Sequence, residues 1–133
     1  MQDPTGFLET ISILVVEDHP GDLTLIRRML GHKSLLHCEI IPARDLSSAL
    51  TQLQYGIDII LLDLNLPDSR GLDTVRRIRD RDLDTPIIVF TGLTEPVTES
   101  EVRSTGAQEF LQKGETDPQT LVNAITRHLR QAG

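Results

Sequence analysis

Five polar side chains in this 133-residue sequence stand at or just beyond the ends of short apolar segments, where β-strands would end. If those strands lie side by side, three carboxylates, one hydroxyl and one ammonium group meet at a single place: Glu17, Asp18, Asp63, Thr91 and Lys113. Carboxylates that close together repel one another unless a divalent cation lies between them. Oxygen ligands without Cys or His indicate a hard ion. Mg²⁺ fits best, because it binds through one or two carboxylates and keeps several waters.

This set of side chains is suited to phosphoryl transfer. We expect Asp18 and Asp63 to be the direct Mg²⁺ ligands. The cation and Lys113 would supply the positive charge that a transferring phosphoryl group needs, and Thr91 could donate a hydrogen bond to one of its oxygens. Asp63 is then the candidate nucleophile, because an aspartate can carry a phosphoryl group as an acyl phosphate. A single aspartate after a strand is more often a turn or capping residue, so the hypothesis depends on four strand ends converging.

Segments typical of strands and of helices alternate five times along the chain. The strand-like segments are short apolar runs at residues 11–16, 36–41, 57–63, 87–90 and 108–111. The helix-like segments carry apolar residues at helical spacing and begin near Pro20, Leu46, Leu72, Glu95 and Pro118. Asp45 is expected to cap the second helix, and Gly106 to end the fourth. Arg76, Arg77 and Arg79 are expected on the solvated face of the third helix.

Five strands separated by helices cannot pair as hairpins, so they predict a parallel sheet with right-handed crossovers. The expected fold is a (βα)5 doubly wound α/β domain, a flavodoxin-like three-layer sandwich with strand order 2-1-3-4-5. That order places strands 1, 3, 4 and 5 side by side, with the candidate residues at one edge of the sheet. We assign residues 11–131 to this single domain and residues 1–10 to an N-terminal leader.

Composition limits the classes of function. With 13 Lys and Arg against 20 Asp and Glu, the formal charge is −7, which argues against direct nucleic-acid binding. The longest apolar runs are too short to cross a membrane, and the first residues lack the features of a signal peptide. The single cysteine, Cys38, can form no internal disulfide and fits a reducing compartment. We therefore expect a cytoplasmic domain that does not act at a membrane.

The pair Glu17-Asp18, Asp63 within DLNLPDSRG, Thr91-Gly92 and Lys113, in this order, resemble the receiver domain of two-component response regulators. The likeness extends from about residue 11 to residue 129. It implies that Asp63 accepts a phosphoryl group, assisted by Mg²⁺, from a histidine kinase or a histidine phosphotransfer protein. It also implies a signalling domain rather than an enzyme. Such a domain would change its binding surface on phosphorylation and act on a downstream protein or a covalently linked effector domain.

The resemblance assigns roles in metal binding to four residues. Asp18, Asp63 and the backbone carbonyl of Asn65 would hold the metal directly. Glu17 would act on it through a water molecule. These assignments agree with the preference of Mg²⁺ for oxygen ligands and retained waters.

The resemblance also assigns a phosphoryl contact and a switch. Thr91 and Lys113 would contact the phosphoryl oxygens. Phe110 falls at the aromatic position that turns inward in this family when the threonine moves, and the alternative is a phenylalanine that only packs in the core. The chain departs from the family at Gly114, where proline commonly follows the lysine. We expect the loop after Lys113 to be more mobile for this reason.

Three other classes of protein share parts of this pattern. A flavodoxin-like cofactor domain would cradle phosphate with its first loop, whereas Glu17-Asp18 would repel phosphate. A phosphohydrolase that works through an aspartyl phosphate usually has a second acid two residues after the nucleophile, where this chain has Asn65. The third class is a receiver-like interaction module that takes no phosphate, although this chain keeps every side chain that phosphorylation requires.

Overall fold

Five parallel strands form one sheet in the order β2-β1-β3-β6-β7. The computed structural model of the chain describes residues 10–31, 37–92 and 96–129, so most of the expected leader lies outside the described residues. The strands are β1 (Ile11–Val16), β2 (Cys38–Ala43), β3 (Ile59–Leu62), β6 (Ile87–Thr91) and β7 (Glu109–Gln112). Counted among themselves, they stand in the order 2-1-3-4-5, which confirms the predicted doubly wound sheet.

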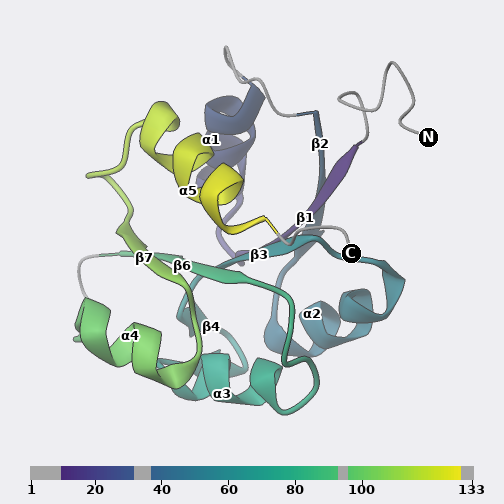
Figure 1. Cartoon of the computed structure of the whole chain (residues 1–133), viewed down its shortest axis with the longest axis vertical. Helices are drawn as coiled ribbons and strands as arrows, with labels where there is room; N and C mark the ends of the chain where they lie inside the picture. Colours follow the sequence, from purple (N-terminus) through teal and green to yellow (C-terminus); the bar gives the residue numbers. More distant parts are fainter. Residues whose placement is uncertain (1–9, 32–36, 93–95, 130–133) are drawn as a thin grey trace.

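Helices cover both faces of the sheet, which gives the molecule three layers (Figure 1). On one face lie α1 (Pro20–Gly31) and α5 (Pro118–His128), and on the other lie α2 (Leu46–Gln52), α3 (Asp73–Arg79) and α4 (Glu99–Thr105). A short 3-10 turn, Leu53–Tyr55, follows α2. Within the described ranges, no helix combines the length and the apolar character needed to cross a bilayer.

The side chains of each central strand alternate between two hydrophobic cores, as the pleat of a strand requires. Ile13 and Val15 of β1 pack in the core beneath α1 and α5, whereas Leu14 and Val16 pack in the core shared with α2, α3 and α4. All four residues of β3 are buried. Burial of each such side chain contributes about 1.5–3 kcal/mol, so both cores resist any shift of these strands. The positions of the strand ends are fixed in consequence.

The second strand lies two residues further along the chain than predicted. It covers Cys38–Ala43 rather than residues 36–41, and residue 36 is outside the described part of the chain. Pro42 therefore lies inside the strand, paired with Val15, instead of ending it. Proline is tolerated there because β2 is the edge strand of the sheet, where one side of the backbone needs no partner.

Helix α4 begins at Glu99, later than the predicted start at residue 95, which is not described. Thr98 and Glu101 form a capping box: the Thr98 hydroxyl accepts from the Glu101 N–H, and the Glu101 carboxylate accepts from the Thr98 N–H. This cap explains how a segment rich in Ser and Thr forms a helix at all. Gly106 ends the helix with a φ of +121°, as its predicted role requires.

The Arg79 side chain is partly buried, so its predicted place on the solvated face of α3 is wrong, whereas Arg76 and Arg77 are exposed. Its Nε and Nη2 donate to the Gly106 carbonyl at 3.0 and 2.8 Å. Its Nη1 donates to the Thr85 carbonyl at 2.8 Å and to the Asp82 carbonyl at 3.0 Å. The guanidinium therefore joins the end of α3 to the start of β6 and to the end of α4.

A small antiparallel hairpin that the sequence did not predict follows β3. Its strands are β4 (Asn65–Leu66) and β5 (Ser69–Arg70). From its turn, the Asp68 carboxylate accepts from the backbone N–H groups of Leu46 and Ser47 at 2.8 and 3.0 Å. Asp45 caps the same helix as predicted, accepting from the Ser48 N–H at 2.8 Å. The loop after β3 is thus fastened to the N-terminus of α2.

We predict that Arg79→Lys lowers the free energy of unfolding by about 1–3 kcal/mol, because an ammonium group cannot satisfy the several carbonyl groups that the planar guanidinium contacts. Chemical denaturation followed by circular dichroism measures this. Arg76→Lys on the exposed face of the same helix is the matched control and should stay within about 0.5 kcal/mol of the wild type. Equal effects in the two variants would show that the hydrogen bonds of Arg79 contribute nothing to the free energy of unfolding.

Candidate functional site

The carboxyl ends of β1, β3, β6 and β7 meet at one edge of the sheet and surround a pocket of about 240 Å³. The residues that line it come from all four strand ends and from the start of α1: Glu17, Asp18, His19, Asp22, Asp63, Asn65, Thr91, Gly92 and Lys113. Every predicted site residue except Phe110 is in this set. The four strand ends therefore converge at one pocket, as the hypothesis of a phosphoryl-transfer site requires.

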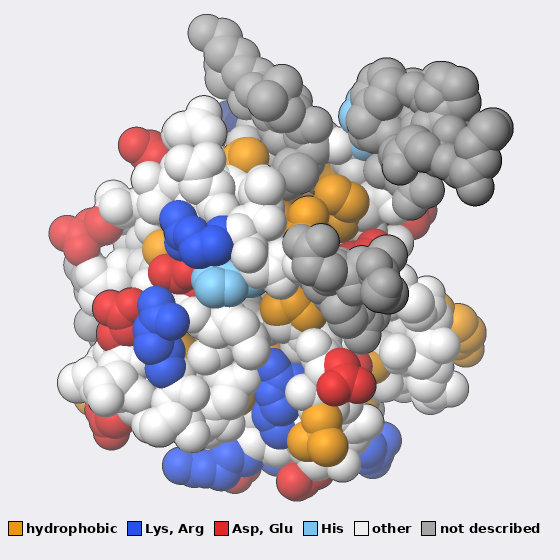
Figure 2. Space-filling view, viewed as in Figure 1, with side chains coloured by type: hydrophobic (Ala, Val, Ile, Leu, Met, Phe, Trp, Pro, Cys, Tyr) orange, Lys and Arg blue, Asp and Glu red, His pale blue; other side chains and the backbone are white. Residues whose placement is uncertain are grey.

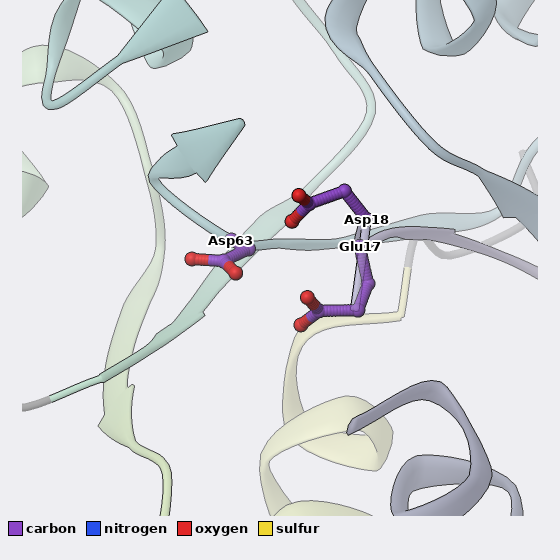
Figure 3. A group of neighbouring side chains, drawn as sticks. All are labelled: Glu17, Asp18 and Asp63. Atoms are coloured by element: carbon purple, nitrogen blue, oxygen red, sulfur yellow. The ribbon is translucent and has the colours of Figure 1, made fainter. Parts of the chain in front are cut away.

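Three carboxylates lie together in the pocket. Glu17 and Asp18 follow β1, Asp63 follows β3, and the Glu17 and Asp18 side chains extend to the side on which Asp63 lies (Figure 3). One oxygen of each carboxylate lies within 4.8 Å of the others. Glu17 is only 3% exposed and Asp63 only 6%, while Asp18 is partly exposed. This donor set consists of oxygen atoms alone and is open on the Asp18 side, which fits a hard divalent cation.

The Asp63 carboxylate is held through both of its oxygens. Oδ1 accepts from the Thr91 hydroxyl at 2.8 Å and from the Asn65 backbone N–H at 3.0 Å. Oδ2 accepts from Lys113 Nζ at 2.9 Å. The backbone fixes the same residue, because the Asp63 N–H donates to the Val16 carbonyl at 3.0 Å. The Asp63 carboxylate is thus held by a side-chain hydroxyl, an ammonium group and a backbone N–H.

Lys113 carries the positive charge of the pocket. Its backbone N–H donates to the Thr91 carbonyl at 2.8 Å, which places the residue directly beyond β7. Its ammonium group donates to the carboxylates of Glu17, Asp22 and Asp63. Burial favours the neutral amine, but these three hydrogen bonds outweigh it and raise the pKa of Lys113 above its usual value. The ammonium therefore stays charged throughout the physiological pH range.

The buried position of Glu17 disfavours its ionised form. Burial raises the pKa of Glu17 to about 7, and the charge of Asp63 acts in the same direction. The hydrogen bond from Lys113 and one from the His19 backbone N–H, at 3.1 Å, oppose the rise. One ammonium group does not fully compensate this set of acids. Additional positive charge, such as that of a bound divalent cation, would favour their ionised forms.

Asp22 is the acidic pocket residue that the sequence-based prediction missed. It lies in the first turn of α1, and its Oδ2 is 2.9 Å from Lys113 Nζ. The signal that could have found it is its place in the first turn of the helix that begins at Pro20, directly after the acidic pair Glu17-Asp18 at the end of β1. Strand ends alone guided the prediction of the site, so an acid on the following helix was overlooked.

Phe110 lies apart from the pocket. It is a partly buried residue of β7 that packs against the core shared with α2, α3 and α4. This position agrees with the simpler of its two interpretations, a phenylalanine that packs in the core. Its assignment as a switch stays a prediction.

Comparison with known proteins decides the family. The sequence profile of the response regulator receiver domain matches residues 13–126, which includes the whole pocket. The chain belongs to the response regulator receiver domain family. The family match and the sequence pattern of the chain thus indicate the same receiver fold.

Two relatives show what this receiver domain is similar to. The cell cycle transcriptional regulator CtrA of Caulobacter vibrioides is 41% identical over 103 residues, which is 76% of this chain and 43% of CtrA. The nitrate/nitrite response regulator protein NarP of Escherichia coli is 33% identical over 119 residues, which is 85% of this chain and 52% of NarP. The chain thus spans about half the length of these two relatives.

Solved structures of receiver domains share the architecture. The chemotaxis protein CheY4 of Vibrio cholerae superposes with a TM-score of 0.75 at 27% identity, covering 91% of this chain and 100% of that one. A LuxR-family two-component response regulator from Aurantimonas sp. SI85-9A1 also gives a TM-score of 0.75, at 28% identity over 90% of this chain and 84% of its own. The likeness extends across nearly the whole receiver domain.

We predict that Lys113→Gln lowers the free energy of unfolding by about 2–4 kcal/mol without metal, because it leaves buried carboxylates uncompensated. Saturating Mg²⁺ should restore more stability to this variant than to the wild type, since a cation replaces the missing charge. Urea denaturation at fixed pH, with Mg²⁺ or with chelator, measures both effects. A stability loss that is the same in the two conditions would contradict the electrostatic account of the pocket.

Proposed function

We propose that Asp63 is the phosphoacceptor of this receiver domain and carries the phosphoryl group as an acyl phosphate. One observation supports this above all. The Asp63 carboxylate lies beside two further carboxylates and accepts hydrogen bonds of 2.8 and 2.9 Å from Thr91 and Lys113. A phosphoryl group there would meet donors already in position.

In the proposed reaction, the phosphoryl donor is a phosphohistidine of a histidine kinase or a histidine phosphotransfer protein. An Asp63 oxygen attacks the phosphorus atom, and a P–O bond forms as the P–N bond breaks. The imidazole nitrogen leaves with the electron pair of that bond. Lys113 and the Thr91 hydroxyl would donate to the phosphoryl oxygens as negative charge moves onto them. Both side chains already contact Asp63 and need little displacement to do so.

Magnesium is the cofactor that we propose for this pocket. Asp18, Asp63 and the backbone carbonyl of Asn65 would hold the ion, and Glu17 would act through water. The oxygen-only donor set and the unfavourable burial of Glu17 support this choice. When bound, Mg²⁺ would neutralise the carboxylates and the phosphoryl oxygens during transfer.

We propose a signalling role for this domain rather than turnover of a metabolite. Phosphorylation would move Thr91 toward the phosphoryl group, and Phe110 would turn inward in response. The changed surface would then act on a downstream protein or on a covalently linked effector domain. CtrA is named a transcriptional regulator and NarP a response regulator, and in both the matched region is about half of the protein.

We also propose that the receiver domain occupies residues 11–131 after a leader at residues 1–10, and that it acts in the cytoplasm without direct contact to nucleic acid or membrane. The net charge of −7 supports the exclusion of nucleic acid. On the face shown in Figure 2, basic side chains are interspersed with acidic ones. Such a mixed surface does not attract a polyanion strongly.

The test is Mg²⁺-dependent phosphorylation by acetyl phosphate, read as a mass shift of the intact protein. We predict that the wild type gains one phosphoryl group and that Asp63→Asn or a chelator abolishes the gain. Asp84→Asn, which changes an exposed aspartate on a loop, is the control and should be phosphorylated like the wild type. A folded wild type without any mass shift would instead favour a phosphate-independent interaction module.

A further inference from the structure

Lys113 has one acidic partner that lies outside the carboxylate cluster. Its ammonium group has three N–H donors, and each is directed to a different carboxylate: Glu17, Asp22 and Asp63. Glu17 and Asp63 belong to the cluster that could hold a cation, together with Asp18, whereas Asp22 does not. Asp22 instead lies in the first turn of α1.

This difference becomes important once the pocket holds a divalent cation and a phosphoryl group. A divalent cation would draw on Glu17 and Asp63, and a phosphoryl group would be attached to Asp63 itself. Of these three acids, Asp22 would then be the one that interacts with Lys113 but with neither the cation nor the phosphoryl group. Its other ionisable neighbour is the exposed ring of His19, 3.9 Å away, which is too distant and too solvated to compete.

We propose that Asp22 is a positioning residue, which holds the Lys113 ammonium on the α1 side of the pocket and weakens its contact with a phosphoryl group on Asp63. This inference rests on the proposed function. The ammonium cannot give all three of its N–H groups to the phosphoryl oxygens while one of them is donated to Asp22. The acid would therefore set how tightly the receiver holds its phosphorylated state.

A second explanation for an acid at this position is a favourable interaction with the N-terminus of α1. Asp73 provides a control for it, because it is an exposed acid in the first turn of α3. Both acids would interact with a helix N-terminus in the same way. Of the two acids, Asp22 is the one that accepts a hydrogen bond from Lys113 Nζ, at 2.9 Å.

The experiment measures the affinity of the full chain for fluoroberyllate, an anionic stand-in for the phosphoryl group, at saturating Mg²⁺. We predict that Asp22→Asn binds about two- to fivefold more tightly than the wild type, the effect expected of a partly exposed ion pair. Asp73→Asn should bind like the wild type. The ammonium resonance of Lys113 in an NMR spectrum should also shift in Asp22→Asn and stay in place in Asp73→Asn.

Two results would overturn the inference about Asp22. One is an affinity of Asp22→Asn that equals or falls below that of the wild type, and the other is an equal gain in Asp73→Asn. Failure of the proposed function gives a different pattern, because the wild type would then neither bind fluoroberyllate nor accept a phosphoryl group from acetyl phosphate. The wild-type measurement therefore separates the two failures.

Discussion

The balance between buried acids and one ammonium group is the interaction on which this site depends. Glu17 and Asp63 are almost completely buried within reach of each other, and Lys113 contacts both. Such an arrangement is costly in a folded protein unless the charges are compensated. The compensation by Lys113 is incomplete, as the raised pKa of Glu17 indicates. The receiver thus keeps a pocket that favours binding of further positive charge next to its proposed phosphoacceptor.

Most of the fold could be predicted from the sequence because its pattern is local. The apolar runs of β1 and β3 and the helical spacing in α2 and α5 each depend on a few neighbouring residues, and the parallel sheet follows from their alternation. The errors arose where tertiary position decides. Pro42 lies within a strand because that strand is at the edge of the sheet. Arg79 is partly buried because carbonyl groups at the end of α4 and just before β6 surround it.

The candidate site was predictable to the same extent and for a related reason. Strand order brings strand ends together, so the sequence pattern alone places Asp63, Thr91 and Lys113 in one pocket. Asp22 was missed because its position depends on how α1 is oriented over the sheet. The fastening of Asp68 to α2 was missed as well, since the residues involved are 22 and 21 positions apart. A sequence pattern can mark where a helix starts, but it does not show which side chain of a distant element contacts that first turn.

The most direct test of the proposed phosphoacceptor is to locate the phosphoryl group chemically. Borohydride reduces an acyl phosphate of aspartate to homoserine, and peptide mass spectrometry then identifies the position. After phosphorylation by acetyl phosphate in Mg²⁺, we predict homoserine at residue 63 and unchanged aspartate at residues 18 and 22. Homoserine at either of those two residues, with residue 63 unchanged, would contradict the claim that Asp63, the buried carboxylate held by Thr91 and Lys113, is the phosphoacceptor.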